Sequence, residues 1–123
     1  MSRRSLLMTC LSILLCLPSS SWSHARLMKS IPARRAVLST PPTRVQLWFN
    51  EPLEARFSQL SVWNAAGQRV DEGDLQVDPQ DAKKLSLNLP RLKIGRYTVK
   101  FRVLSVDSHL ITNQFSFTVE PTP

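Results

Sequence analysis

The chain has 123 residues, of which 42% are apolar and 20% are charged, and its formal net charge is +7 at pH 7. This length fits one domain with a single modest core. A positive charge is compatible with binding to nucleic acid or to an anionic membrane surface, but the basic residues are spread along the chain and form no nucleic-acid-binding motif. We therefore interpret the charge as a solvated surface and predict no nucleic acid partner.

The first residues have the pattern of a secretory signal peptide. Arg3 and Arg4 form a positively charged start, and residues 6–17 form an apolar run. Ser21 and Ser23 place small residues at both recognition positions of a signal-peptidase cleavage site. The sequence therefore predicts export across a membrane followed by cleavage.

Cleavage at this point divides the chain into a signal peptide, residues 1–23, and a mature domain, residues 24–123, in the periplasm. The apolar run is shorter than the roughly 20 residues that cross a bilayer, so we expect no stable membrane insertion after cleavage. An uncleaved membrane anchor is the alternative. Both cysteines, Cys10 and Cys16, leave with the leader. The mature domain then has no disulfide or thiol, and its stability must come from apolar burial.

Alternation of apolar and polar residues with a period of two dominates the mature sequence. In residues 96–103, the apolar side chains of Tyr97, Val99, Phe101 and Val103 alternate with polar ones, as expected of a half-buried β-strand. Similar segments lie at residues 44–50, 57–63, 84–89 and 115–119. Turn-forming clusters separate them and no segment has strong helical periodicity, so the pattern favours an antiparallel sandwich or small barrel.

Two tryptophans of the mature domain need a separate interpretation. Trp48 and Trp63 fall out of phase with the inward-facing residues of their predicted strands. We interpret them as a cover for the second face of a sheet or for the end of a barrel. The alternative is a stacking surface for a sugar.

The mature domain contains two histidines, His24 and His109. His24 becomes the first residue after cleavage, so it can offer a metal ion both its α-amine and its imidazole. His109 follows Asp107 by two residues. Together these groups supply three nitrogens and one carboxylate oxygen without any sulfur. That set suits Cu(II) in a tetragonal arrangement better than Cu(I), although imidazole also suits zinc and nickel.

The spacing of Asp107 and His109 predicts a shared direction. In extended backbone, residues i and i+2 point to the same side, roughly 6.5–7 Å apart, so both side chains can lean toward one ion. The local sequence does not tell whether His24 returns to meet them. The metal site therefore rests at this point on the coincidence of a terminal histidine with the only other histidine of the chain.

Several motifs follow one another along the mature sequence. His-Ala-Arg-Leu opens it at residues 24–27, and Trp-Phe-Asn-Glu-Pro-Leu occupies residues 48–53. More specific are Gly-x-Tyr at 95–97, Ser-x-Asp-x-His at 105–109 and Phe-x-Phe at 115–117. Taken together, the motifs resemble the CopC family (CopC/YobA-like) of periplasmic copper-resistance proteins over essentially the whole mature chain. The resemblance implies an all-β fold: a single Greek-key β-barrel or sandwich of about seven strands, immunoglobulin-like or cupredoxin-like.

By this resemblance, the Cu(II) ligands are the amine and imidazole of His24, the carboxylate of Asp107 and the imidazole of His109. Glu51 matches a family position near the copper and is a candidate acceptor for a ligand or a bound water, with a solvent-facing residue as the alternative. Family members with a second, Cu(I) site carry a methionine-rich stretch, whereas Met28 is the only methionine of the mature domain. Because thioether ligands select Cu(I), we predict a Cu(II) site alone.

We predict a periplasmic protein of copper resistance or homeostasis that sequesters Cu(II) or passes it to a membrane partner. The resemblance implies that this partner is a CopD-like inner-membrane copper protein. We expect no enzyme activity. One alternative is a copper-dependent oxidative enzyme, since a terminal histidine paired with a second histidine is similar to the site of polysaccharide-cleaving monooxygenases. The other is a metal-free immunoglobulin-like interaction module.

Overall fold

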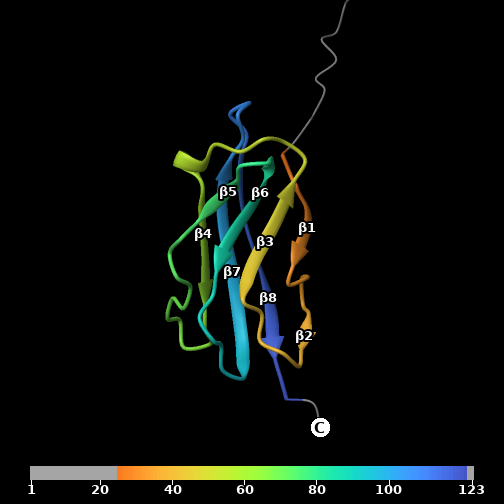
Figure 1. Ribbon diagram of the computed structural model, residues 1–123, viewed down its shortest axis with the longest axis vertical. Coiled ribbons are helices and arrows are strands. Elements are labelled where there is room, and N and C mark those ends of the chain that lie inside the picture. The colour runs from red at the N-terminus through yellow and green to blue at the C-terminus, as the bar shows by residue number, and fades with distance from the viewer. Residues whose placement is uncertain (1–24, 122–123) are drawn as a thin grey trace, which may run out of the picture.

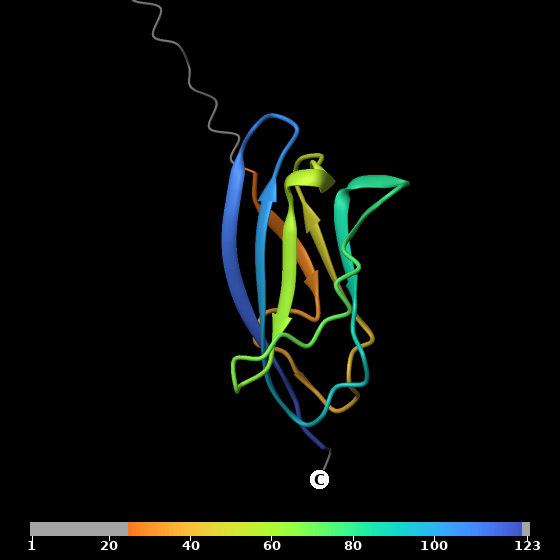
Figure 2. The same ribbon diagram turned by 90° about the vertical axis from the view of Figure 1, so that its left-hand side faces the viewer.

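Two four-stranded β-sheets face each other in the computed structural model, which describes residues 25–121 (Figures 1 and 2). The first sheet has the strand order β1-β3-β6-β5, and the second has the order β2-β8-β7-β4. The strands of the first sheet are β1 (Leu27–Ile31), β3 (Arg44–Phe49), β5 (Gln76–Asp78) and β6 (Asp81–Asn88). Those of the second are β2 (Val37–Leu38), β4 (Gln59–Trp63), β7 (Gly95–Leu104) and β8 (Leu110–Val119). A short 3-10 helix, Ala55–Phe57, lies between β3 and β4.

The prediction of an all-β, Greek-key fold is confirmed, and the two separate sheets make it a sandwich. It has eight strands within residues 25–121, against the predicted seven or so. The predicted strand at 57–63 begins at Gln59, because Phe57 belongs to the 3-10 helix. The strand predicted at 115–119 begins earlier, at Leu110. Sequence alternation did not identify β1, β2 and β5. The burial of β1 does not alternate along the strand, and β2 and β5 have two and three residues, too few for a period to be recognised.

The apolar core lies between the sheets and uses the inward side of each alternating strand. Phe49 of the first sheet and Phe101 of the second meet edge to face, with ring centroids 5.7 Å apart. Within the second sheet, the rings of Tyr97 and Phe117 stack with centroids 5.4 Å apart, and the Tyr97 hydroxyl donates to the carbonyl of Lys93. The buried members with no measurable exposure are Val45, Leu47, Val62, Leu85, Val99, Val103 and Phe117. Burial on this scale supplies most of the stability of a domain without disulfides.

Trp48 and Trp63 lie half-buried on the outer faces of the two sheets, as the packing interpretation predicted. The Nζ atoms of Lys29 and Lys84 lie 4.9 and 5.0 Å from the centre of the Trp48 ring. Lys100 covers Trp63 in the same way, at 5.0 Å. Ammonium groups on the ring faces gain cation–π attraction and shield the rings, so the structure gives no support to a sugar-stacking surface.

A buried carboxylate fixes the connection between β4 and β5. The side chain of Asp71 has no exposed area, and its oxygens accept hydrogen bonds from the backbone N–H groups of Val62 and Gly73 and from the guanidinium of Arg69. Desolvation opposes the charged form, but the hydrogen bonds from Arg69, Val62 and Gly73 outweigh it, and the pKa of Asp71 is lowered. The carboxylate therefore stabilises the fold in its ionised form.

This arrangement predicts a stability that depends on pH. A carboxyl group with a lowered folded pKa stabilises the protein above its unfolded pKa of about 3.9, and loses that contribution as the pH falls through the folded pKa. Asp71→Asn should therefore lower the free energy of unfolding at pH 7 by roughly 1–3 kcal/mol, and the difference from the wild type should shrink at acidic pH. Urea unfolding at a series of pH values measures both. The control is Glu72→Gln, an exposed neighbouring acid; equal effects of the two changes would contradict the assignment.

Candidate metal centre

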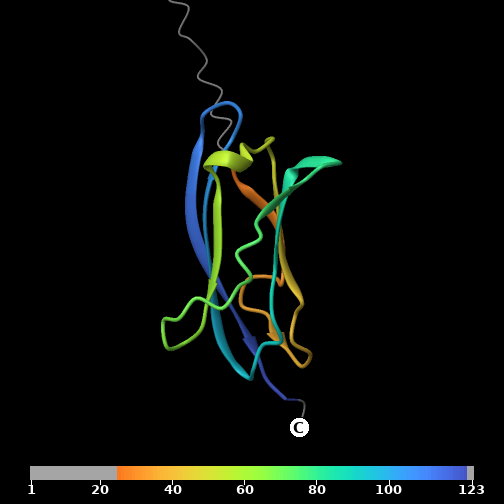
Figure 3. The ribbon, with the colours of Figure 1, turned by 60° about the vertical axis from the view of Figure 1, so that its left-hand side comes forward.

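Three segments that are distant in the sequence meet at one end of the sandwich, which we call the hairpin end because it carries the turn between β7 and β8, residues 105–109. The end of β3 and the start of the described chain lie at the same end (Figure 3). The backbone N–H of Arg26 donates to the Asn50 side chain at 2.7 Å, and the Asn50 N–H donates back to the Arg26 carbonyl at 3.2 Å. Ala25, one residue earlier, is 7% exposed. Residues 25 and 26 are thus fastened beside Glu51.

Glu51 is the central polar side chain of this end. It is 7% exposed, and its two carboxylate oxygens lie 3.0 and 3.2 Å from Nδ1 of His109. Hydrogen bonds from His109 and Ser105 lower the pKa of Glu51, with desolvation acting in the opposite direction. Since an ionised carboxylate only accepts hydrogen bonds, Nδ1 of His109 is the donor. Nε2 of His109 is then the ring nitrogen that Glu51 leaves free for another partner.

Ser105 holds His109 in place from the other side. Its hydroxyl accepts the backbone N–H of His109 at 3.0 Å and hydrogen-bonds to Glu51. The Ser105 N–H donates to the His109 carbonyl at 2.9 Å, and the residue itself is only 1% exposed. A bridge between Leu53 and Ser105 ties the turn to the chain that leaves β3. One buried hydroxyl therefore orients both the histidine and the carboxylate.

The expectation that Asp107 and His109 lie in extended backbone is wrong. The β7–β8 pairing continues to Leu104 and Leu110, so residues 105–109 must reverse the chain direction. Asp107 lies in the turn, and Ser108 has a φ of 66°, in the left-handed region. Asp107 is exposed, whereas His109 is partly buried. A turn rather than a strand therefore sets their separation and directions.

The structure brings together only some of the predicted site residues. Glu51 and His109 are joined, so the alternative of a solvent-facing Glu51 is wrong. His24 and the predicted leader lie outside the described residues. Within residues 25–121, no three His, Cys, Asp or Glu side chains form a group that could hold a metal ion by themselves. The sequence analysis assigned no role to Ser105 and Asn50, whose hydrogen bonds hold the hairpin end together. The only sequence signal for either is that Ser105 opens the Ser-x-Asp-x-His motif.

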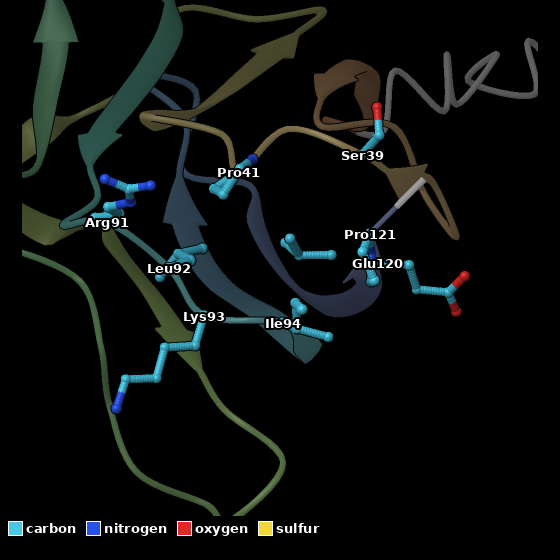
Figure 4. A pocket seen from close by; sticks show the side chains of 9 residues that line it. Ser39, Pro41, Arg91, Leu92, Lys93, Ile94, Glu120 and Pro121 are labelled. Carbon is cyan, nitrogen blue, oxygen red and sulfur yellow. The ribbon is translucent and has the colours of Figure 1, made fainter. Parts of the chain in front are cut away.

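The opposite end of the sandwich holds a cavity of about 530 Å³ (Figure 4). Leu92, Ile94 and Val119 give it apolar walls, and Arg91 and Lys93 lie at its border. None of the predicted metal-binding residues lines it. Among residues 25–121, the structure has no helix with the length and apolar content to cross a membrane. The hairpin end, with its histidine and buried carboxylate, is therefore the better candidate for metal chemistry.

This β-sandwich presents an imidazole and a carboxylate at one end, and both are groups that bind divalent metal ions in proteins. The profile described as the CopC domain matches residues 27–120, and the chain belongs to the CopC family. It is 31% identical over 113 residues to the copper transport protein CutJ of Bacillus subtilis; the match covers 89% of this chain but only 20% of CutJ. Copper-handling proteins are thus among its relatives.

Two solved structures extend the comparison to the fold. The crystal structure of CopC from Methylosinus trichosporium OB3b superposes with a TM-score of 0.75 at 33% identity, covering 81% of this chain and 97% of that one. PcoC from Escherichia coli, described as a methionine-rich copper resistance protein, gives a TM-score of 0.66 at 28% identity and covers 80% of this chain and 100% of its own. The sandwich described above is the fold of this family.

The double role of Ser105 is testable by removing its hydroxyl. Ser105→Ala should lower the free energy of unfolding by roughly 1–3 kcal/mol, because a buried carboxylate and a backbone N–H each lose a partner. Amide hydrogen exchange at His109 should become faster. Ser39→Ala, an exposed change in the loop that follows β2, should alter the stability by less than about 0.5 kcal/mol. Urea unfolding measures the stability and NMR measures the exchange. Equal stabilities and equal exchange rates in the two variants would contradict this role for Ser105.

Proposed function

We propose that this chain is a periplasmic protein of copper resistance or homeostasis that binds one Cu(II) ion at the hairpin end. The ion is cargo that the protein sequesters or passes on, and enzyme activity is no part of the proposal. The single observation that carries it is that residues 25 and 26, Glu51 and His109 meet at one end of the sandwich. The proposed ligands are the α-amine and imidazole of His24, the carboxylate of Asp107 and the imidazole of His109.

The position of Ala25 supports the role of His24. Ala25 is buried, the next residue is hydrogen-bonded to Asn50 in both directions, and Asn50 precedes Glu51. His24 directly precedes this fastened segment in the sequence. Removal of residues 1–23 would then create an α-amine in the neighbourhood of the Glu51–His109 pair.

The Glu51–His109 bond supports the role of His109. A metal-binding histidine commonly donates its second ring N–H to a carboxylate, which fixes the ring and makes the free nitrogen a better ligand. Here Nδ1 donates to Glu51, so Nε2 is the nitrogen proposed for Cu(II). Asp107 lies in the same turn and is exposed, which leaves its carboxylate free to turn toward an ion.

The donor set favours Cu(II) and makes binding sensitive to pH. Nitrogen and oxygen ligands suit Cu(II), whereas Cu(I) prefers thioethers and thiolates. A free α-amine has a pKa of about 7.7–8.0 and a free imidazole of about 6.5, so Cu(II) must displace protons and its affinity should fall as the pH drops. Met28 is the only thioether after residue 23 and is 56% exposed, in contrast to the methionine-rich PcoC. We therefore propose no Cu(I) site.

A membrane protein is the proposed recipient. CutJ is named a copper transport protein, and the region that this chain matches is a fifth of its length. That relation supports a domain which works beside a larger copper-transporting partner, here a CopD-like inner-membrane copper protein. The signal-peptide pattern of residues 1–23 supports release of residues 24–123 into the periplasm, where such a partner is reachable.

Substitutions at the hairpin end test the ligand set. His109→Ala and Asp107→Asn should each weaken Cu(II) binding more than Glu51→Gln, for which a loss of about 10–100-fold is typical of a partner that orients a ligand. Glu120→Gln, an exposed acid that follows β8 at the opposite end, should leave the affinity unchanged. Competition titration with a chelator of known affinity, and EPR of the Cu(II)-loaded protein, measure these effects. Wild-type affinity in His109→Ala would overturn the assignment.

Processing provides a separate test of His24. A protein that keeps one extra glycine before His24 retains every side chain but turns the proposed amine ligand into a peptide group. It should bind Cu(II) more weakly than the protein that begins at His24, and its EPR spectrum should change because one nitrogen is lost. Mass spectrometry establishes the N-terminus of each protein. Equal affinity and identical spectra in the two would exclude the α-amine as a ligand.

A further inference from the structure

The outer face of the second sheet carries a hollow built around three arginines. It has a volume of about 480 Å³ and lies between the turn that precedes β2 and the adjoining parts of β7 and β8. We call it the arginine pocket. Its lining residues are Arg34, Arg35, Arg96, Thr98, Gln114, Phe115 and Ser116. None of them belongs to the proposed copper site, so the pocket stands apart from that function.

Contacts with β8 involve the side chains of Arg34 and Arg96 and the backbone of Arg35. The backbone N–H of Arg35 donates to the Ser116 carbonyl at 2.7 Å, and Arg35 has a φ of 62°, a left-handed conformation that is uncommon for a residue with a side chain. The Arg34 guanidinium lies 5.8 Å from the centre of the Phe115 ring. From β7, Arg96 donates to the Ser116 hydroxyl at 3.3 Å. Two segments far apart in the sequence thus supply arginines to the lining of one pocket.

The charge of the pocket is uncompensated. No acidic residue lines it, and none of the ion pairs within residues 25–121 involves Arg34, Arg35 or Arg96. All three arginines are exposed, so their charges are accessible to a dissolved anion. Along β7, Lys100 and Arg102 continue the same outer face with two further positive charges.

We propose that the arginine pocket binds a phosphate-type oxyanion, either free phosphate or the phosphate of an anionic lipid headgroup. The planar N–H fork of a guanidinium matches two oxygens of such an anion, and three of them match its multiple charge better than they match a single carboxylate. Thr98, Gln114 and Ser116 add neutral donors at the rim. The volume lies in the range of about 300–1,000 Å³ that is usual for small-ligand sites.

The binding test uses metal-free protein expressed from the full chain. Phosphate is titrated and followed by calorimetry and phosphorus NMR line width, and vesicles of phosphatidylcholine with or without phosphatidylglycerol are tested by co-sedimentation. Arg34→Gln and Arg96→Gln should each weaken binding by about tenfold or more, because each removes a charged hydrogen-bond donor. The matched control is Arg44→Gln, which removes an exposed arginine from the first sheet and should have little effect.

The two sources of the anion give different results. Arginine-dependent, saturable binding of inorganic phosphate assigns the free ion, and arginine-dependent binding to phosphatidylglycerol vesicles alone assigns the lipid headgroup; either result supports the pocket. The absence of binding to both probes overturns the proposal. So does binding that Arg44→Gln weakens as much as Arg96→Gln, because that pattern would indicate general surface charge. Circular dichroism confirms that each variant is folded, and Cu(II) affinity should be unchanged in all of them.

Discussion

The hydrogen bond between the Glu51 carboxylate and the His109 imidazole joins the two sheets of the sandwich at the hairpin end. Glu51 follows β3 of the first sheet, and His109 lies in the turn between β7 and β8 of the second. A buried carboxylate is tolerated only when its oxygens are hydrogen-bonded, so the turn must approach β3 closely. Ser105 satisfies this requirement by contacting both partners. The arrangement of the candidate metal centre therefore depends on one buried charge and its donors.

The same end of the molecule is closed by the first strand. β1 pairs with β3, and the mutual hydrogen bonds of Arg26 and Asn50 continue this contact beyond the strand. The pairing that completes the first sheet also holds Ala25 and Arg26 at the hairpin end. Formation of the first sheet and the position of residues 25 and 26 thus depend on the same β1–β3 pairing, so a change that loosens β1 would affect both.

Local periodicity was sufficient to predict most of the strands, since alternation is visible within residues 44–50, 84–89 and 96–103. It did not reveal β1, whose burial does not alternate, or β2 and β5, which are too short to show a period. It also gave the wrong backbone for Asp107, because a hairpin turn was treated as extended chain. Local periodicity could not predict any contact between residues that are distant in the sequence. No local pattern distinguishes a buried Glu51 from a solvated one, or places Arg34 beside Arg96; those outcomes depend on which strands become neighbours.

The interleaved core has a consequence for how the domain could exchange a metal ion. The contact between Phe49 and Phe101, and the apolar side chains around it, close the space between the sheets without any ligand. Small domains that are ordered by their metal unfold when it leaves, since binding and folding are a single event there. In this sandwich, the domain would stay folded after an ion leaves the hairpin end, and it could then bind another ion. Such a core would allow the proposed copper cargo to be captured and released repeatedly without refolding of the domain.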